Sequence, residues 1–179
     1  MKKSTWKLLR SEQGKNLIIA KVRFDTWQNP RNGVEIKATV LDTPDWVNIV
    51  ALTPEGKILL VKQFRLGIAA LTTETPAGVV EEGEDPQDAA IRELAEETGY
   101  TTDDWSYLGW VEPNPAFQNN HCHQFLAKNV VRTQNVNQDD GEDVGFCEMT
   151  LDEIKEEIKA GRMRNSLSLL TLSRVFDIW

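Results

Sequence analysis

One stretch of 23 residues, from Gly78 to Tyr100, constrains the fold of this chain most: GVVEEGEDPQDAAIRELAEETGY. Asp85 is a favourable N-cap, and Pro86 suits the first helical turn, where its missing N–H removes no hydrogen bond. Apolar residues at helical spacing then form one face, and Gly99 can end the helix in a left-handed conformation. The stretch therefore predicts a loop up to residue 84 followed by an amphipathic helix.

The predicted helix carries a cluster of carboxylates. Glu93 and Glu97 are four residues apart and share one face, with Glu96 beside them, and Arg92 is placed to orient Glu96. Carboxylates so close together repel one another, and a hard divalent cation bound through oxygen relieves that repulsion. The alternative is a solvated acidic helix face, which is common for glutamate-rich helices. The loop glycines, Glu84 and the spacing of Arg92 favour a metal site.

The spacing of these residues resembles the Nudix box, Gly-x5-Glu-x7-Arg-Glu-apolar-x-Glu-Glu-x-Gly-apolar. Every fixed position is filled, with tyrosine where an aliphatic residue is more usual at the end: Gly78, Glu84, Arg92, Glu93, Leu94, Glu96, Glu97, Gly99 and Tyr100. The resemblance implies a Nudix hydrolase in which Glu93, Glu96 and Glu97, with the carbonyl of Ala77, bind Mg²⁺ or Mn²⁺. It implies catalytic roles for Glu96 and Arg92, and supporting roles for Gly78, Glu84 and Gly99.

Two segments outside the box, Gln63-Phe-Arg65 and Glu74-Thr-Pro-Ala-Gly78, resemble the ADP-ribose and nucleotide-sugar branch of the Nudix hydrolases. The resemblance makes Arg65 a candidate ligand of the pyrophosphate, because guanidinium binds phosphate oxygens as a fork. Glu74 is a candidate hydrogen-bond partner of a sugar hydroxyl. For both residues the alternative is an ion pair on the protein surface.

Two loops after the box extend the resemblance. Pro115 lies sixteen residues beyond the last glycine of the box, as in the ADP-ribose branch, although Ala116 stands where that branch commonly has glycine. In the resembling enzymes, a glutamate from a later loop reaches the metals as a ligand or general base. Glu142 in the acidic segment 135–146 is the best match. Its rivals are Asp139, Asp140 and Asp143, and a merely solvated loop is the alternative.

The first half of the chain has the pattern of β-strands. Residues 4–11 suggest a short strand, and a stronger strand is predicted to begin at Asn16, with alternating apolar residues over 18–24. The turn 29–33 contains Asn-Gly and predicts a hairpin with a strand over 34–40. A second hairpin joins 46–52 to 57–64. Residues 58–61 are apolar on both faces, which is typical of a central strand.

The second half adds the elements needed for an α/β protein. Residues 107–111 and 119–127 predict strands. Residues 151–160 predict a helix that begins after a capping residue, Thr150, and the apolar pattern of 166–179 predicts a second helix. The resemblance implies the Nudix fold, an α/β/α sandwich with a central mixed sheet and an N-terminal antiparallel strand region. We expect one domain over 1–179, in which 1–45 serve dimerisation and base binding and 46–179 form the catalytic core.

Aromatic and metal-binding side chains outside the box have simpler alternatives. Trp27 and Trp46 lie at predicted strand ends, where related enzymes bind the base, and stacking on a base contributes ~1–3 kcal/mol. Core packing is their alternative role. His121 and His123 would share one face of a strand, but zinc needs two further ligands and Cys122 points the other way. We therefore expect a strand at the edge of the core rather than a zinc site.

Composition limits the classes of function. The net charge of −8 offers no basic surface for nucleic acid. Hydrophobic residues at 40% and charged residues at 27% argue against disorder. Two cysteines, Cys122 and Cys147, make no disulfide framework. The N-terminus lacks an apolar targeting segment and no long apolar run follows, so we expect a soluble, cytoplasmic protein without a membrane partner.

The resemblance implies a metal-dependent hydrolase of nucleoside diphosphate sugars such as ADP-ribose or GDP-mannose. The products would be a nucleoside monophosphate and a sugar phosphate. A domain that binds a nucleotide sugar as a sensor, without cleaving it, is one alternative. A hydrolase of dinucleoside polyphosphates or nucleoside triphosphates is another, disfavoured by Pro115 and the segment at Glu74. The resembling branch commonly dimerises, so we expect a homodimer.

Overall fold

The computed structural model of the protein describes residues 5–137 and 143–179. The chain forms two compact units. One consists of Met1–Pro44 and Glu112–His121, and the other of Asp45–Val111 and Cys122–Trp179. No helix in the described ranges is long and apolar enough to cross a membrane.

The first unit is built on a three-stranded antiparallel sheet of β1 (Lys7–Asn16), β2 (Lys21–Gln28) and β3 (Glu35–Asp42), in that order. The predicted turn over 29–33 does join β2 to β3, with Gly33 at φ 74°. The segment 112–121 runs beside β3, where the Leu41 N–H donates to the Phe117 carbonyl at 2.7 Å.

The predicted start of a strand at Asn16 is wrong, because a tight turn interrupts the alternating pattern. The Leu17 N–H donates to the Ala20 carbonyl at 2.7 Å, and Asn16 pairs with Lys21. Ile18 is fully exposed at this turn rather than on the face of a strand. A period of two between Ile18 and Ala20 does not by itself distinguish an extended segment from a reversal of the chain.

The second unit contains a seven-stranded mixed sheet. The order is β12-β5-β4-β10-β9, with β6 on β5 and β7 on β4, and the β4–β10 pair alone is parallel. A separate pair is formed by β8 (Tyr100–Thr101) and β11 (Val131–Arg132). The strands of the main sheet are β4 (Trp46–Leu52), β5 (Ile58–Arg65), β6 (Ala70–Glu74), β7 (Ala77–Val79), β9 (Asp104–Val111), β10 (Cys122–Lys128) and β12 (Val144–Met149).

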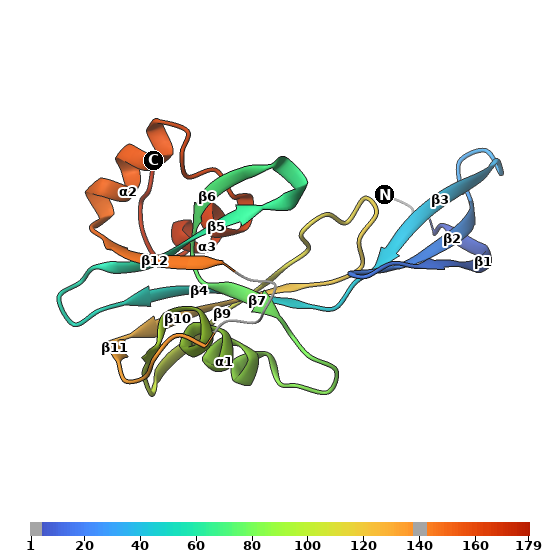
Figure 1. Ribbon diagram of the computed structural model, residues 1–179. Helices are drawn as coiled ribbons and strands as arrows, with labels where there is room; N and C mark the ends of the chain where they lie inside the picture. Colours follow the sequence, from blue (N-terminus) through green and yellow to red (C-terminus); the bar gives the residue numbers. More distant parts are fainter. Residues whose placement is uncertain (1–4, 138–142) are drawn as a thin grey trace. The chain divides into compact units, whose positions relative to one another are not determined.

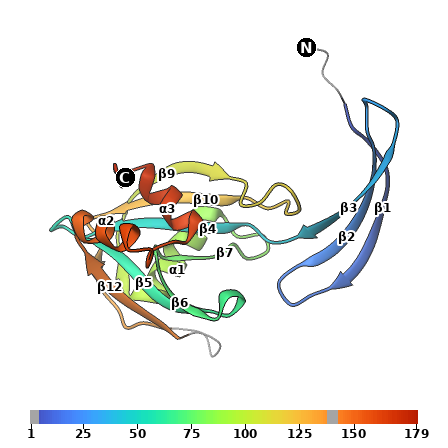
Figure 2. The same cartoon turned by 90° about the horizontal axis from the view of Figure 1, so that it is seen from above.

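Helices cover both faces of this sheet, so the predicted α/β/α sandwich is confirmed (Figures 1 and 2). On one face, α1 (Pro86–Thr98) packs through Ala90 and Leu94 against Val47, Ile49 and Leu59. On the other, α2 (Leu151–Lys159) and α3 (Ser166–Ser173) pack against Val50 and Leu60. Helix α3 ends at Ser173, so the helix predicted to reach residue 179 is shorter, although Ile178 remains buried.

The segment 70–79 is inserted between β4 and β5. These two strands pair directly only at Ala51–Leu59 and Leu52–Ile58, next to their hairpin turn. Beyond that point β6 pairs with β5 over residues 70–74, and β7 pairs with β4 over residues 77–79. The insertion carries the segment from Glu74 to Gly78 into the middle of the sheet, against α1 on one side and α3 on the other.

Candidate active site

Helix α1 forms as its local sequence predicts. The Asp85 carboxylate accepts a hydrogen bond from the Gln87 N–H at 2.8 Å, and Pro86 occupies the first turn. Gly99 ends the helix at φ 76°, and its N–H donates to the Ala95 carbonyl. A Cβ at Gly99 would overlap the carbonyl of Gln134, so only glycine fits both the conformation and the space. These fixed ends determine which residues α1 presents toward β7.

Arg92 connects the acidic residues of the box. Its Nε and Nη2 each donate to Glu84 at 3.0 Å, and Nη1 donates to Glu93 at 2.8 Å and to Glu96 at 3.1 Å. Nη2 also reaches the Val79 carbonyl at 2.9 Å. Hydrogen bonding to Glu84 is the main cause of the raised pKa of Arg92, and the same bonds hold the pKa of Glu84 below its usual range. The expected contact with Glu96 is thus part of a wider network.

Glu93 and Glu97 lie against the backbone of β7. Glu97 is 3% exposed, and its Oε2 accepts a hydrogen bond from the Ala77 N–H at 3.1 Å. The Glu93 carboxyl group occupies the space where a Cβ of residue 78 would stand, so Gly78 permits the close approach. This geometry brings two box carboxylates to the Ala77–Gly78 backbone.

The donor set predicted for this place, carboxylates with the Ala77 carbonyl, suits Mg²⁺ or Mn²⁺. Within residues 5–137 and 143–179, no three Asp, Glu, His or Cys side chains converge as they would around a bound ion. Glu93 and Glu96 are instead held by Arg92. The metal-binding roles of Ala77, Glu93, Glu96 and Glu97 therefore stay predictions.

A pocket of about 270 Å³ adjoins the Ala77–Gly78 backbone. Its walls come from β4, the end of β5, β6, β7 and the start of α3: Trp46, Val47, Asn48, Arg65, Glu74, Ala77, Gly78, Val79, Asn165 and Leu167. Arg65 and Glu74 also border a larger pocket of about 680 Å³ that extends along the β5–β6 hairpin to Arg164. Gly78, at the start of the box, and Arg65 thus line the same pocket, and the Ala77–Gly78 backbone against which Glu93 and Glu97 lie forms part of its wall.

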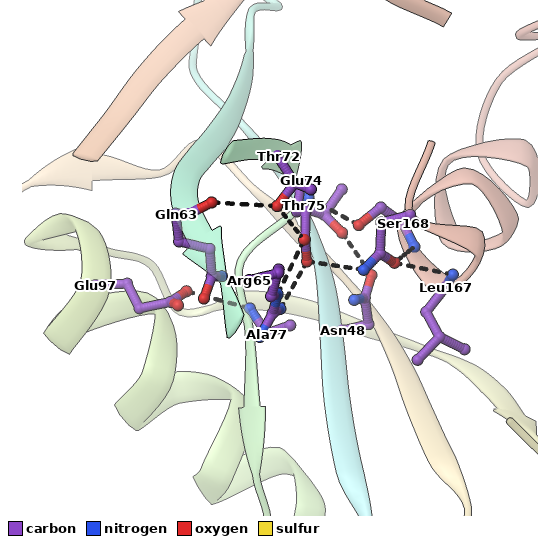
Figure 3. Close-up of polar contacts among 11 residues, drawn as sticks. Asn48, Gln63, Arg65, Thr72, Glu74, Thr75, Ala77, Glu97, Leu167 and Ser168 are labelled. Carbon is purple, nitrogen blue, oxygen red and sulfur yellow. Dashed lines mark hydrogen bonds and ion pairs between the residues drawn. The ribbon is translucent and has the colours of Figure 1, made fainter. Parts of the chain in front are cut away.

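Glu74 is buried, at 1% exposure, and its carboxylate faces the guanidinium of Arg65 (Figure 3). Its carboxylate accepts hydrogen bonds from Arg65 Nε at 3.0 Å and Nη2 at 2.6 Å, and from Asn165 at 2.9 Å. Burial would raise the pKa of Glu74, but hydrogen bonds from Arg65 and Thr72 outweigh it, so the pKa lies below the usual range. The alternative of a surface ion pair is wrong for Glu74, whereas its contact with a sugar stays a prediction.

The predicted loop carboxylate, Glu142, lies outside the described residues, as do its rivals Asp139 and Asp140. Asp143 is described and exposed. On the near side of the gap, the Asn137 N–H donates to the Glu96 carbonyl at 3.0 Å. On the far side, Val144 pairs with Gln63.

Other predicted residues lie elsewhere. Trp46 lines the smaller pocket, whereas Trp27 on β2 and Pro115 in the 112–121 segment belong to the first unit. His123 contacts Asp45 at 3.2 Å and Tyr107 at 3.0 Å, and His121 precedes β10. No zinc cluster is found among the described residues. Burial raises the pKa of the Cys122 thiol to about 12, so it remains protonated at neutral pH.

Sequence reasoning missed three polar residues that line the two pockets: Asn48, Thr72 and Asn165. Asn165 caps α3 by accepting from the N–H groups of Leu167 and Ser168, and an asparagine before an apolar helix is a recognisable signal. Asn48 interrupts the apolar strand WVNIVAL, which could also have marked it. Thr72 carries no comparable signal in its surroundings.

The fold and the site together define a mixed-sheet α/β domain in which an acidic helix, with its carboxylates held by Arg92, packs against a strand that lines a pocket. Comparison with known families places it: residues 42–170 match the NUDIX domain, and the chain belongs to the NUDIX family. The predicted fold and family resemblance are confirmed.

Individual relatives extend the match over most of the chain. The methanol dehydrogenase activator of Bacillus methanolicus is 34% identical over 167 residues, which cover 93% of this chain and 90% of that protein. The ADP-ribose pyrophosphatase of Bacillus subtilis (strain 168) is 38% identical over 123 residues, which cover 68% of this chain and 66% of that protein. A crystal structure of an ADP compounds hydrolase has a TM-score of 0.83, covering 95% of this chain and 91% of that chain. At 18% identity, this likeness shows the fold.

Proposed function

We propose that this protein hydrolyses the pyrophosphate of nucleoside diphosphate sugars of the ADP-ribose or GDP-mannose type. The products are a nucleoside monophosphate and a sugar phosphate. The observation that carries the proposal is the position of Glu93 and Glu97 against the Ala77–Gly78 backbone, beside the pocket that Arg65 lines. The similarity to a protein named ADP-ribose pyrophosphatase supports this substrate class.

The carboxylates of α1 are suited to hold divalent cations. Glu93, Glu96 and Glu97, with the Ala77 carbonyl, would bind Mg²⁺ or Mn²⁺ through oxygen. A bound cation supplies neutralisation of the pyrophosphate charge and lowers the pKa of a coordinated water. Arg92 limits the movement of Glu93 and Glu96 through its hydrogen bonds, which reduces the cost of ordering them around a ligand.

Arg65 is suited to bind the substrate itself. Its side chain is 43% exposed and borders both pockets, so the guanidinium can donate to non-bridging pyrophosphate oxygens while the Glu74 carboxylate holds it in place. In the hydrolysis, a water oxygen bonds to one phosphorus as that phosphorus loses the bridging oxygen, which leaves with the other phosphate. Glu142 remains the predicted residue that positions or deprotonates this water.

A panel of substrates tests the proposal. ADP-ribose, GDP-mannose, dinucleoside polyphosphates and nucleoside triphosphates are incubated with the protein, with Mg²⁺ or with EDTA, and products are separated by chromatography. We expect the two nucleotide sugars to be cleaved fastest, with activity abolished by EDTA and restored by Mg²⁺ or Mn²⁺. Full activity in EDTA, or cleavage of triphosphates alone, would refute the proposal.

Two non-hydrolytic functions are tested by further experiments. A sensor would bind a nucleotide sugar in a calorimetric titration without releasing a monophosphate. One relative, aligned over 93% of this chain, bears the name methanol dehydrogenase activator, and its match includes the first unit as well as the second. Action on a partner dehydrogenase is therefore a second candidate, tested by adding the protein to a methanol dehydrogenase and measuring its turnover.

We infer that the first unit mediates a homodimer. Apolar side chains remain exposed on its three-stranded sheet, with Leu8 and Ile36 on one face, where both pair with Trp27, and Phe24 on the other. A second copy of the chain is a suitable partner for the face that carries Leu8 and Ile36. Trp27 on β2 is the candidate residue for stacking on a base. Sedimentation should give a species of twice the 20.3 kDa chain mass, and a single 20.3 kDa species at micromolar concentration would refute the dimer.

A further inference from the structure

Asn48 is a buried amide whose nitrogen has no protein partner in the described ranges. It lies on β4, directly opposite Ala77 of β7, and is 2% exposed. Its Oδ1 accepts a hydrogen bond from the Thr75 hydroxyl. No hydrogen bond from its Nδ2 to another described residue is present. A polar group in this position usually has a partner, so the side chain points to a ligand.

The orientation of the Asn48 amide is determined from behind. Thr75 and Ser168 are fully buried, and the Thr75 N–H donates to Ser168 Oγ at 3.1 Å. The Thr75 hydroxyl donates to Asn48 and to no other described acceptor. This fixes Oδ1 on the side of Thr75 and leaves Nδ2 on the opposite side of the amide. In Figure 3 that nitrogen is directed away from Thr75, toward Ala77 and Arg65.

The Asn48 nitrogen is accessible to the smaller pocket. Five other side chains in the described part of the chain have a fully buried polar atom without a partner. Asn48 Nδ2 is not among these atoms, so it retains some solvent exposure. Asn48 lines the 270 Å³ pocket together with Trp46, Val79 and Leu167, which supply apolar walls. The small exposed part of the Asn48 side chain therefore includes the Nδ2 donor, which faces the pocket.

The residues that line the smaller pocket favour a ligand group with an uncharged hydrogen-bond acceptor. Arg65 already offers charged donors for anionic oxygens at this pocket. Asn48 is uncharged, and its acceptor atom is occupied by Thr75, so it presents donor capacity alone. An aromatic and aliphatic surface with one neutral donor suits the uncharged part of a nucleotide sugar.

We propose that this pocket is a subsite for the sugar or the base of the substrate, in which Asn48 Nδ2 donates a hydrogen bond to a neutral oxygen or nitrogen acceptor. The inference rests on the proposed hydrolysis of nucleotide sugars. It assigns a specificity role to a residue outside the Nudix box. A substrate with an acceptor at this place binds better than an analogue that lacks it, because the analogue leaves the buried amide unpaired.

The test compares Asn48→Leu with Thr75→Val. Both variants break the internal Thr75–Asn48 bond, but only Asn48→Leu removes the donor that faces the pocket. We expect KM for the best nucleotide sugar to rise about 3- to 10-fold more in Asn48→Leu than in Thr75→Val, the range of one neutral hydrogen bond, with kcat within about twofold. Thermal unfolding identifies a variant that fails to fold, in which case Asn48→Ser, with a shorter reach, takes its place.

Product inhibition then shows which half of the substrate meets Asn48. Weaker inhibition of Asn48→Leu by the sugar phosphate, with inhibition by the nucleoside monophosphate unchanged, assigns the acceptor to the sugar. The reverse pattern assigns it to the base. Equal KM and equal inhibition constants for Asn48→Leu and Thr75→Val would overturn the inference while leaving the hydrolase proposal intact. A wild-type protein inactive on all nucleotide sugars would instead refute the hydrolase proposal.

Discussion

The guanidinium of Arg65 is paired with the buried carboxylate of Glu74 through two hydrogen bonds, from Nε at 3.0 Å and from Nη2 at 2.6 Å. Glu74 is held in turn by Asn165 at the start of α3, so a residue 91 positions away helps to set the position of Arg65. The arginine is consequently anchored at one end while 43% of its side chain stays exposed at the pocket. Glu74 thus acts as a positioning residue for Arg65.

Glu74→Gln should lower kcat/KM on nucleotide sugars by about 10- to 100-fold, because a misplaced binding group can cost about that much. Arg65→Lys retains the charge but loses the fork, and should have a similar effect. The double variant should be little worse than either single variant, since both act on one unit. Steady-state kinetics on the four proteins measures this. Fully additive losses would show that the two residues act independently.

The Arg65–Glu74 pair should also make stability depend on pH. The folded-state pKa of Glu74 is lowered, so its contribution is present above the ordinary value of about 4.3 and is lost as pH falls through the folded-state pKa. We expect Glu74→Gln to lower the free energy of unfolding by about 1–3 kcal/mol near neutral pH. This is less than for a fully buried ion pair, because solvent screens the partly exposed Arg65. Urea unfolding from about pH 7 to about pH 3 should show the difference shrinking. A constant difference would contradict the assignment.

Glu97→Gln should abolish most hydrolysis without unfolding the protein. The glutamine carbonyl can still accept the hydrogen bond from the Ala77 N–H, so the packing of α1 against β7 is retained. The lost charge should raise the Mg²⁺ concentration needed for half activity. Glu156→Gln on the exposed face of α2 is the matched control and should behave like wild type. Equal activity in the two variants would exclude Glu97 from the metal site.

Gly78→Ala should reduce activity strongly, because its Cβ would overlap the Glu93 carboxyl group and force that side chain away from β7. Gly145→Ala is the control, since its nearest added contact is the Lys62 carbonyl at 4.0 Å. Activity and thermal unfolding are measured for both. If Gly78→Ala retains wild-type kcat, the close approach of Glu93 to the backbone is not needed for the reaction.

Glu142→Gln tests the predicted loop carboxylate. A general base contributes about 10²–10⁴-fold to rate, so kcat should fall within that range while substrate affinity changes far less. A metal ligand would in addition raise the Mg²⁺ requirement, which separates the two roles. If the variant keeps wild-type kcat while a substitution of Asp139, Asp140 or Asp143 abolishes activity, the catalytic carboxylate lies in this loop but is not Glu142.

Local signals explain why the box could be predicted so closely. Asp85, Pro86 and Gly99 determine the ends of α1 through capping and backbone conformation, which act over a few residues. The position of Arg92 relative to Glu96 follows from helical spacing. The hydrogen bonds from Arg92 to Glu84 depend on how the loop before α1 folds back, but both residues belong to the same short stretch of sequence.

Contacts distant in sequence account for what could not be predicted. The burial of Glu74 depends on Asn165, and the orientation of Asn48 depends on Thr75 and Ser168. No short-range pattern records that β6 enters between β4 and β5, because only strand pairing across the sheet determines it. At the turn Leu17–Ala20 the local pattern was itself ambiguous, because it fitted a strand as well as a turn.

The insertion of β6 and β7 into the sheet makes the candidate site sensitive to chain length at one place and tolerant at another. Successive residues of a strand face opposite sides of a sheet, so a slip of one residue between Glu74 and Ala77 would exchange their faces. The pairing of β6 with β5 and of β7 with β4 fixes the register on both sides of this segment, so a shift of one residue cannot be accommodated without breaking strand pairs. The hairpin tip over Leu66–Ile68 is exposed and can accept added residues. Length variants of this protein should therefore retain a site when altered at the tip and lose it when altered at Thr75–Pro76.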